Sequence, residues 1–377
     1  MKVLLVATVQ SHICQFHKPL CRVLRAHGAE IHVAAKDNLA EKNGLKLDFA
    51  DRVFDLPFSR SPKSKDNLAA YKELKKLIDE GDYDVIHCNT PMGGIVARLA
   101  SKKARRQGAK VYYTAHGFHF YKGAPKKAWL AFYPIEKFFA RFLTDKVITI
   151  TEEDFKLADK KFACPAYRIH GVGVDAERYH PVSEEERIAL KTAHGFSPED
   201  EIILCVGELL PNKNQATAIR MTAELVKTHP HAFLVLAGNG SEKDYMLTLA
   251  KRYEISDRVI LPGYLTDLEV WQRMADVSVA CSIREGLGLN VIEALLSGTP
   301  AVASDNRGHR ELIKQGENGF LYPVSDDKEM LKYVSLLLSD KEMRKRISLS
   351  APATVVPYTA AEVEKELEAI YFGEENG

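Results

Sequence analysis

The chain lacks the features that would assign it to a membrane-spanning, secreted or metal-binding class. None of its apolar runs approaches the roughly 20 residues that a membrane-spanning helix needs. The opening stretch, MKVLLVATVQSH, is too short an apolar run for a signal peptide, and we expect a first buried strand there. The six cysteines are scattered without metal-type spacing, so we expect reduced thiols in a cytosolic protein.

Several functional motifs are also missing. The loop after the first expected strand has no GxGxxG, which argues against a dinucleotide-dependent oxidoreductase. No acidic pair of the DxD kind stands out as a metal site, and there are no internal repeats or low-complexity tracts. What remains is a composition of 46% hydrophobic and 27% charged residues, typical of a soluble globular protein, in a chain of 377 residues that is long enough for two domains.

The net charge of +1 hides a strong asymmetry between the two halves. Residues 1–175 carry 30 Lys and Arg against 19 Asp and Glu, a net charge of +11, and the remainder carries 22 against 32, a net charge of −10. A basic first half suggests an anionic partner, which is a membrane surface, a phosphorylated acceptor or nucleic acid. The alternative is a solvated surface whose charge bias is accidental.

The most informative stretch runs from residue 277 to residue 306. Val277–Ala280 is a short apolar run that predicts a buried parallel strand. Gly286 and Gly288 open the following loop, where they allow the backbone to approach a ligand closely. A helix is expected from Leu289 until Gly298 stops it, and a second strand follows at Ala301–Ala303.

Two carboxylates mark this unit, Glu285 in the loop and Glu293 inside the helix. Glu293 follows Glu285 by eight positions of mostly helical chain, which places the two about 10 Å or more apart, too far for a hydrolase pair. They are better placed to hold two ends of one ligand, with an anion bound between them by free N–H groups of the helix start. A nucleotide-sugar fits that description. The alternative is a solvated Glu on each side of an ordinary strand–helix turn.

The spacing resembles a family signature at this point. Glu285, seven intervening residues and Glu293, followed by Gly298-Thr299-Pro300 and Ala303-Ser304-Asp305, look like the donor site of retaining glycosyltransferases of family 4. The resemblance implies that Glu285 contacts hydroxyls of the donor sugar and that Glu293 contacts the ribose.

It also implies the GT-B fold. That fold is α/β, with two Rossmann-like domains facing a central cleft and a C-terminal helix that crosses back to the first domain. We expect residues 1–175 with the helix at 358–373 to form the acceptor domain, and 176–357 to form the nucleotide-sugar donor domain.

Other segments of the second half fit the donor role. Gly207 ends a strand and Lys213 opens the next helix, an arrangement that suits a diphosphate. The family carries Lys at Lys213, but many members carry Arg where this chain has Glu208, and Arg284 is one substitute. The expected donor-binding set is Gly207, Lys213, Asn214, Gly238, Asn239, Gly240, Gly263, Tyr264, Arg284, Glu285, Gly286, Leu287, Gly288, Leu289 and Glu293.

His116 is the strongest single candidate in the first half. The expected strand Lys110–Thr114 delivers it beside Gly117, at the edge of a parallel sheet where ligands bind. The runs TAHGFHFYKG, PIEKFFAR and TDKVITIT resemble family members that build bacterial capsular or exopolysaccharide repeat units, in which the equivalent of His116 lies near the donor sugar. We therefore expect catalytic roles for His116, Lys213 and Glu285.

The acceptor side carries weaker signals with open alternatives. His12 and His17 lie in an expected loop at residues 9–17, where plain surface residues are as common as ligand contacts. The two glycines at 93 and 94 suggest either an anion cradle or tight strand–helix packing. Phe118–Tyr121, with Lys122, Lys126, Lys127 and Trp129, suggests either a membrane interface or a packed helix hairpin. The expected acceptor-side set is His12, His17, Asn89, Gly93, Gly94 and Phe118.

Together these patterns predict a retaining, metal-independent glycosyltransferase without a cofactor. The donor is expected to be a UDP-sugar, and the acceptor a polyprenyl-diphosphate-linked sugar or another saccharide. The protein itself is expected in the cytoplasm, peripheral on the inner face of the plasma membrane. The alternatives are a sugar-nucleotide epimerase of the same fold and a non-catalytic sugar-nucleotide-binding protein. A nucleic-acid partner is not expected, because no recognisable nucleic-acid motif accompanies the basic half.

Overall fold

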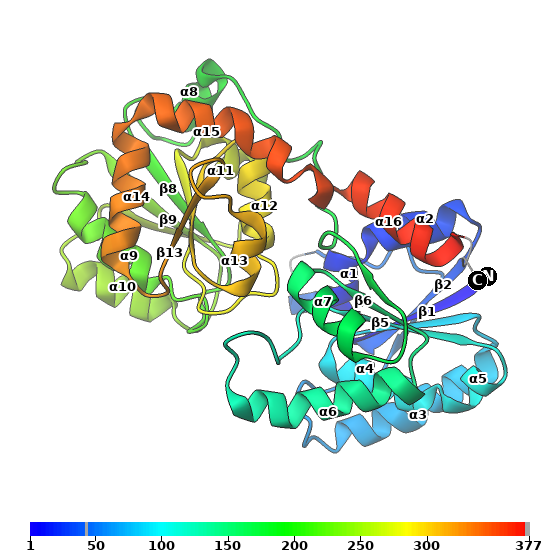
Figure 1. Cartoon of the computed structure of the whole chain (residues 1–377). Helices are drawn as coiled ribbons and strands as arrows, with labels where there is room; N and C mark the ends of the chain where they lie inside the picture. The colour runs from blue at the N-terminus through cyan, green and yellow to red at the C-terminus, as the bar shows by residue number, and fades with distance from the viewer. Residues whose placement is uncertain (42–43, 374–377) are drawn as a thin grey trace. The chain divides into compact units, whose positions relative to one another are not determined.

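The computed structural model describes residues 1–41 and 44–373 and divides the chain into two compact units (Figure 1). Unit 1 comprises Met1–Gly173 together with the chain from Ala360 on, and unit 2 comprises Val174–Thr359. Each crossing between the units lies two residues from the boundary expected from the sequence. Both units consist of a parallel β-sheet with helices on its faces, as the sequence predicts.

The sheet of unit 1 has seven strands, all parallel, in the order β3-β2-β1-β4-β5-β6-β7. Its central strands β1 and β4 are buried along almost their whole length, because helices cover both faces of the sheet. The strands are β1 (Lys2–Val9), β2 (Glu30–Lys36), β3 (Arg52–Asp55), β4 (Val85–Asn89), β5 (Lys110–Ala115), β6 (Lys146–Thr149) and β7 (Ala166–Arg168).

The helices of unit 1 include one that the sequence analysis assigned to a loop. Residues 10–16 form α1, because Gln10, Ile13 and Cys14 share one face of a helix and bury it. Residues 91–106 form two helices that are divided at Ser101, whose hydroxyl donates to the carbonyl of Ala97. The helices are α1 (Gln10–Phe16), α2 (Lys18–Ala26), α3 (Asp66–Gly81), α4 (Pro91–Ala100), α5 (Lys102–Arg106), α6 (Lys126–Phe142), α7 (Glu152–Lys161) and α16 (Ala360–Phe372), with a short 3₁₀ turn at Leu39–Glu41.

A buried ion pair fixes α6 to α4. The guanidinium of Arg98 donates two hydrogen bonds to the carboxylate of Glu136, at 2.7 and 3.1 Å, and a third to the carbonyl of Gly94. The same guanidinium lies over the ring of Tyr113. Breaking such a buried pair typically costs about 3–5 kcal/mol, so α6 is held firmly against the rest of unit 1.

The last helix, α16, returns to unit 1 and packs against α2, as Figure 1 shows. Glu364 and Glu368 of α16 pair with Arg22 and His27. Tyr371 reaches further in, where its hydroxyl makes a hydrogen bond of 2.5 Å with Nδ1 of His87 on β4. The terminal helix is therefore part of the core of unit 1.

Unit 2 holds a six-stranded parallel sheet in the order β10-β9-β8-β11-β12-β13. Its strands are β8 (Glu201–Val206), β9 (Ala232–Ala237), β10 (Val259–Gly263), β11 (Val277–Ala280), β12 (Ala301–Ser304) and β13 (Gly319–Tyr322). Its helices are α8 (Glu184–Ala193), α9 (Ala216–Leu225), α10 (Lys243–Arg252), α11 (Leu268–Met274), α12 (Leu289–Leu296), α13 (Arg307–Leu312), α14 (Asp327–Ser339) and α15 (Lys341–Thr354), with a 3₁₀ turn at Val356–Tyr358.

Each sheet reverses its strand order once. In unit 1 the reversal lies between β1 and β4, and in unit 2 it lies between β8 and β11. The loops that leave such neighbouring strands diverge to opposite sides, which opens a crevice at the carboxyl edge where α/β folds bind ligands. No helix among the residues that the structure describes is both long enough and apolar enough to cross a lipid bilayer.

Candidate functional site

The carboxyl edge of unit 2 brings Lys213 and Glu285 together from either side of the strand reversal. Lys213 lies in the loop after β8 and Glu285 in the loop after β11, 72 residues further along the chain. Their side chains form an ion pair of 2.5 Å, and the hydroxyl of Ser282 donates a second hydrogen bond of 2.6 Å to Glu285. Burial opposes ionisation of this carboxyl, but Lys213 and Ser282 outweigh it and lower the pKa of Glu285.

Lys213 keeps donor capacity for a ligand. An ammonium group has three N–H donors, and the pair with Glu285 engages one of them. The aliphatic part of Lys213 lies over Gly207, because a Cβ at Gly207 would be 3.6 Å from Cδ and Cε of the lysine. The positive charge is therefore held in a defined place beside the end of β8.

The loops after β8 and β9 interlock through glycine. A Cβ at Gly238 would lie 2.1 Å from the carbonyl oxygen of Gly207, so only glycine fits there. Leu209 donates a backbone hydrogen bond to the carbonyl of Asn239. Gly238 therefore has a packing reason for its presence, and this packing fixes the backbone of the loop that carries Lys213.

The start of α12 also lies at the carboxyl edge of the sheet of unit 2, after the loop that follows β11. Gly288 adopts a left-handed backbone with φ of 98°, and a Cβ there would be 3.0 Å from the ring of His309. No side chain of the described residues caps the first turn of α12. The first N–H groups of a helix carry partial positive charge, so this turn suits an anionic ligand.

Glu293, in the second turn of α12, has partners that the sequence analysis missed. Tyr179 is hydrogen-bonded to its carboxyl, and the guanidinium of Arg178 lies close enough to interact with it electrostatically. Burial is the largest influence and exceeds the opposing effects of Arg178 and Tyr179, so the pKa of Glu293 rises to about 7. Both partners precede the first helix of unit 2, and no motif marks them.

Among the other residues expected to bind the donor, some side chains are exposed to solvent and others are engaged or buried within unit 2. Tyr264 is half-exposed, and Arg284 is exposed beside Glu285. Asn214 instead turns its amide to Ser325 and the carbonyl of Cys281, while Leu287 is buried against the backbone of Gly308. His309 was missed by the sequence analysis, although it lies beneath Gly288 and its Nε2 is buried without a hydrogen-bond partner among the described residues.

Unit 1 carries a pocket of about 840 Å³ at the carboxyl edge of its own sheet. Most of its wall is apolar and comes from α1, α4, α6 and the segment after β5. Arg60, His12 and His116 supply polar groups to the same wall. The combination suits an amphiphilic ligand with a polar and an apolar part.

Only some of the expected acceptor-side residues line this pocket. His12, His116 and Phe118 line it, whereas His17, Asn89, Gly93 and Gly94 do not. A Cβ at Gly93 would be 3.0 Å from the backbone of β1, and one at Gly94 would be 2.7 Å from the ring of Tyr113. Tight strand–helix packing, one of the two alternatives left by the sequence, therefore accounts for both glycines.

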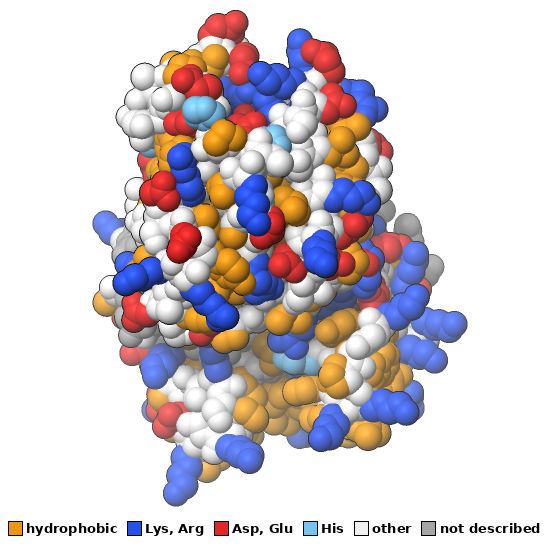
Figure 2. All heavy atoms as spheres, turned by 90° about the vertical axis from the view of Figure 1, so that its left-hand side faces the viewer, with side chains coloured by type: hydrophobic (Ala, Val, Ile, Leu, Met, Phe, Trp, Pro, Cys, Tyr) orange, Lys and Arg blue, Asp and Glu red, His pale blue; other side chains and the backbone are white. Residues whose placement is uncertain are grey.

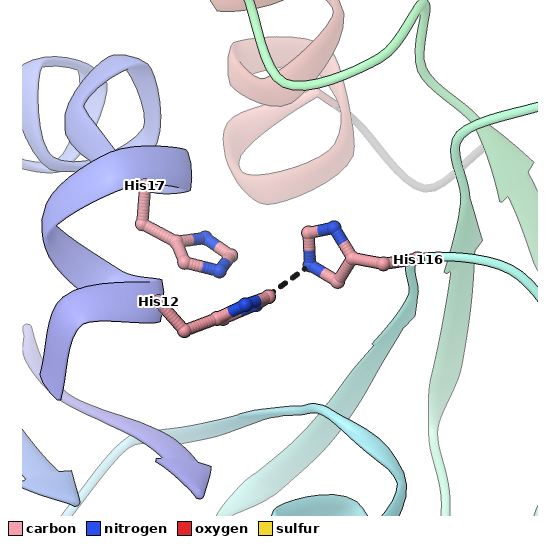
Figure 3. A group of neighbouring side chains, drawn as sticks. All are labelled: His12, His17 and His116. Carbon is pink, nitrogen blue, oxygen red and sulfur yellow. Dashed lines mark hydrogen bonds between the residues drawn. The ribbon is translucent and has the colours of Figure 1, made fainter. Parts of the chain in front are cut away.

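The three histidines of this region form one cluster (Figure 3). Nε2 of His12 and Nε2 of His116 are 3.2 Å apart, and the ring of His17 lies 5.5–5.6 Å from both rings. Burial lowers the pKa of all three imidazoles, for His116 to about 4. They are therefore neutral at pH 7.

The aromatic segment after β5 is part of the core. Phe118 and Phe120 are buried and stacked on each other, and Trp129 donates to the carbonyl of Tyr121. Of the two alternatives left by the sequence, a membrane interface or a packed segment, these two phenylalanines therefore follow the packed one. The exposed apolar side chains are further along α6, namely Leu130, Phe132, Ile135, Phe138 and Phe142.

The raised pKa of Glu293 predicts a measurable effect on stability. The carboxyl of Glu293 has its ordinary pKa of 4.5 in the unfolded chain and a pKa of about 7 in the folded protein. Between these two pH values the unfolded chain has lost this proton and the folded protein still holds it, so wild-type stability falls as the pH rises through this window. Glu293→Gln removes the ionisation and still accepts a hydrogen bond from Tyr179. We expect the variant to exceed wild type in stability at pH 8 by up to about 3 kcal/mol, and to match it near pH 4.5.

Urea denaturation of both proteins across this pH range, followed through the transition of unit 2, measures the difference. The control is Glu199→Gln, at an exposed position of unit 2, which should follow wild type at every pH. A difference between Glu293→Gln and wild type that stays constant with pH would contradict the assignment.

Comparisons with known proteins agree with this architecture. The family model described as "Glycosyl transferases group 1" matches residues 186–353, and that described as "Glycosyl transferase 4-like" matches residues 2–151. A crystal structure of Anabaena HepE in complex with UDP and glucose superposes with a TM-score of 0.77 at 20% identity, covering 98% of this chain and 99% of that one. This likeness identifies the fold as GT-B.

Two curated relatives match by sequence over most of their lengths. The "Putative glycosyltransferase EpsD" of Bacillus subtilis is 43% identical over 373 residues, covering 98% of this chain and 96% of the relative. The "UDP-Gal:alpha-D-GlcNAc-diphosphoundecaprenol alpha-1,3-galactosyltransferase" of Escherichia coli is 26% identical over 316 residues, covering 80% of each. With both units matched by family models and a full-length relative at this identity, the chain belongs to the group 1, family 4-like glycosyltransferases.

Proposed function

We propose that this protein transfers a sugar, with retention of anomeric configuration, from a UDP-sugar to a lipid-linked saccharide during synthesis of a cell-surface polysaccharide. The observation that carries the proposal is the ion pair of Lys213 with Glu285 at the strand reversal of unit 2, followed by α12 and Glu293. A cation and a helix start suit the diphosphate of such a donor, and the two separated carboxylates suit its sugar and its ribose.

The comparisons support the choice of UDP. The Anabaena structure contains UDP and glucose, and the name of the E. coli relative specifies UDP-Gal. In our proposal Glu285 accepts hydrogen bonds from sugar hydroxyls, Glu293 accepts from the ribose, and Tyr264 and Asn239 lie beside the nucleotide. Glu293 is the better acceptor when ionised, so nucleotide affinity should increase as the pH rises through about 7.

The proposed chemistry relies on groups of the protein and the donor, without a divalent ion at the diphosphate. The hydroxyl oxygen of the acceptor bonds to the anomeric carbon on the face that the diphosphate leaves, the bond from that carbon to the phosphate oxygen breaks, and the hydroxyl proton passes to an oxygen of the departing phosphate. Lys213 and the first N–H groups of α12 stabilise the charge that develops on UDP. His116 is proposed to contact the donor sugar.

The pocket of unit 1 supports an amphiphilic acceptor. Its polar groups, Arg60 and His12, suit phosphate and sugar oxygens, and its apolar wall suits the start of a polyprenyl chain. The name of the E. coli relative specifies an acceptor sugar on diphosphoundecaprenol, which has this chemistry.

The exposed face of α6 supports a location at a membrane surface. Leu130, Phe138 and Phe142 are 78%, 53% and 51% exposed, and Lys126, Lys127, Lys137 and Arg141 lie on the same helix. Figure 2 shows hydrophobic side chains beside Lys and Arg side chains on the surface. A helix with apolar and basic exposed side chains is typical of segments that lie in a bilayer interface.

The direct test is turnover. Purified protein incubated with a panel of UDP-sugars and a polyprenyl-diphosphate-linked saccharide should release UDP and form an α-linkage when the donor is an α-linked UDP-sugar, as read by NMR of the anomeric proton. EDTA should leave the rate unchanged. A β-linked product from that donor would contradict retention, and a free epimer formed without acceptor would favour the epimerase alternative.

Lys213 tests the donor site itself. Lys213→Ala should weaken UDP binding by about 1.5–3 kcal/mol, the scale of a charged hydrogen bond, and leave uridine binding almost unchanged. Isothermal titration calorimetry measures both ligands in the same preparation. The exposed Lys227→Ala, also in unit 2, is the control and should bind both ligands like wild type. Equal losses for UDP and uridine would show that Lys213 does not act on phosphate.

The surface of α6 tests the membrane proposal. Wild type should sediment with vesicles that contain anionic lipid, be released by high salt, and stay free with neutral vesicles. Each basic residue near an anionic surface contributes about 1 kcal/mol, and each buried Leu or Phe about 1.5–3 kcal/mol. Lys126→Glu with Lys127→Glu, and separately Leu130→Ser with Phe138→Ser, should each reduce the bound fraction while UDP binding persists.

Leu349 provides the matched control for the apolar pair. It is 76% exposed but lies in unit 2, so Leu349→Ser should bind vesicles like wild type. The proposal fails if wild type ignores anionic vesicles at low salt, or if both α6 variants bind them as wild type does.

A further inference from the structure

The histidine cluster of unit 1 has a geometry that its place in the proposed acceptor pocket does not explain. His12 lies on α1, His17 directly follows that helix, and His116 follows β5, and in Figure 3 the three rings point toward one another. One nitrogen from each ring can be chosen such that all three lie within 4.8 Å of one another. No other group of three His, Cys, Asp or Glu side chains in the described part of the chain reaches such an arrangement.

We infer that His12, His17 and His116 form a binding site for one transition-metal dication of the zinc type. In a tetrahedral zinc site the bonds to histidine are about 2.0–2.1 Å, which places the ligand nitrogens about 3.3–3.4 Å apart. Nε2 of His12 and Nε2 of His116 are already 3.2 Å apart. His17 has to approach by about 1.5 Å at most to complete the set, which is within reach of a side-chain rotation.

The hydrogen bonding of His17 points to a missing ligand. Its Nε2 is buried and has no hydrogen-bond partner among the residues that the structure describes. Leaving a buried polar atom unpaired typically costs about 1–3 kcal/mol, and a metal ion bound to that nitrogen would remove the cost. A neutral imidazole has one nitrogen with a free lone pair. The hydrogen bond between Nε2 of His12 and Nε2 of His116 places a proton on one of these nitrogens, and that proton has to move to Nδ1 of its ring before both nitrogens can bind an ion.

The ligand set also selects the class of ion. Three imidazoles without a carboxylate suit zinc, copper or nickel and disfavour magnesium, calcium and manganese, which prefer oxygen ligands. His12 and His116 line the pocket, and His17 lies behind them. The fourth position of a tetrahedral ion would therefore face the pocket, where water or an anionic oxygen can occupy it.

This inference shares His116 with the contact to the donor sugar proposed above, but it does not depend on the donor site of unit 2. The histidines belong to unit 1, whereas Lys213, Glu285 and Glu293 belong to unit 2. Zinc binding can therefore be measured in the absence of any sugar donor or acceptor, and its failure would leave the proposed glycosyl transfer untouched.

The experiment uses full-length protein without a histidine tag, stripped with EDTA and dialysed. Calorimetric titration with zinc should show one saturable site per chain, and cobalt should give the intense visible absorption of tetrahedral coordination. His12→Gln and His17→Gln keep side chains of similar size and should each weaken zinc binding by more than about 100-fold, beyond the 10–100-fold typical of losing a supporting residue. Circular dichroism verifies that both variants are folded.

His119→Gln is the matched control, because His119 lines the same pocket but lies outside the cluster. It should bind zinc like wild type, and magnesium should not bind to any of the proteins at this site. The inference is overturned if stripped wild type shows no saturable one-to-one binding. It is equally overturned if His12→Gln and His17→Gln, both folded, retain wild-type affinity, because the ion would then be held by other histidines.

Discussion

The parallel direction of every strand is the constraint on which the rest of this structure depends. In both sheets the carboxyl ends of all strands lie at one edge, and the single reversal of strand order opens that edge between two loops. Lys213 and Glu285, 72 residues apart, meet there in unit 2. His12 and His116, 104 residues apart, meet at the equivalent edge of unit 1. Residues of distant loops therefore become neighbours without any long-range motif in the sequence.

Burial then gives these edge residues their chemical character. Glu285 stays ionised because Lys213 and Ser282 compensate its desolvation, whereas Glu293 is compensated less and its pKa rises to about 7. Burial lowers the pKa of the three clustered imidazoles of unit 1, those of His12, His17 and His116, and keeps them neutral. The two edges thus offer different chemistry, one a charged pair beside a helix start and the other a set of neutral nitrogen ligands beside an apolar pocket.

Helix α6 links the pocket of unit 1 to its exposed surface. Phe132 and Ile135 belong to the wall of the pocket and are also among the exposed apolar residues of the helix. Glu136, on the next position, holds the helix to Arg98 of α4. One helix therefore carries an apolar surface from solvent into the pocket.

The sequence by itself determined the strands, because fully buried parallel strands are short apolar runs, and it determined the donor-site loop, because its carboxylates and glycines lie close together in the chain. Local patterns also placed His116 at the end of β5 and Lys213 beyond β8. Only the tertiary structure decided which residues surround these groups. Tyr179 contacts Glu293 although 114 positions of the chain separate them. The rings of Phe118 and Phe120 turn inward because α6 and α7 cover them. Side-chain contacts between elements depend on packing in three dimensions, and periodicity along the chain does not contain that information.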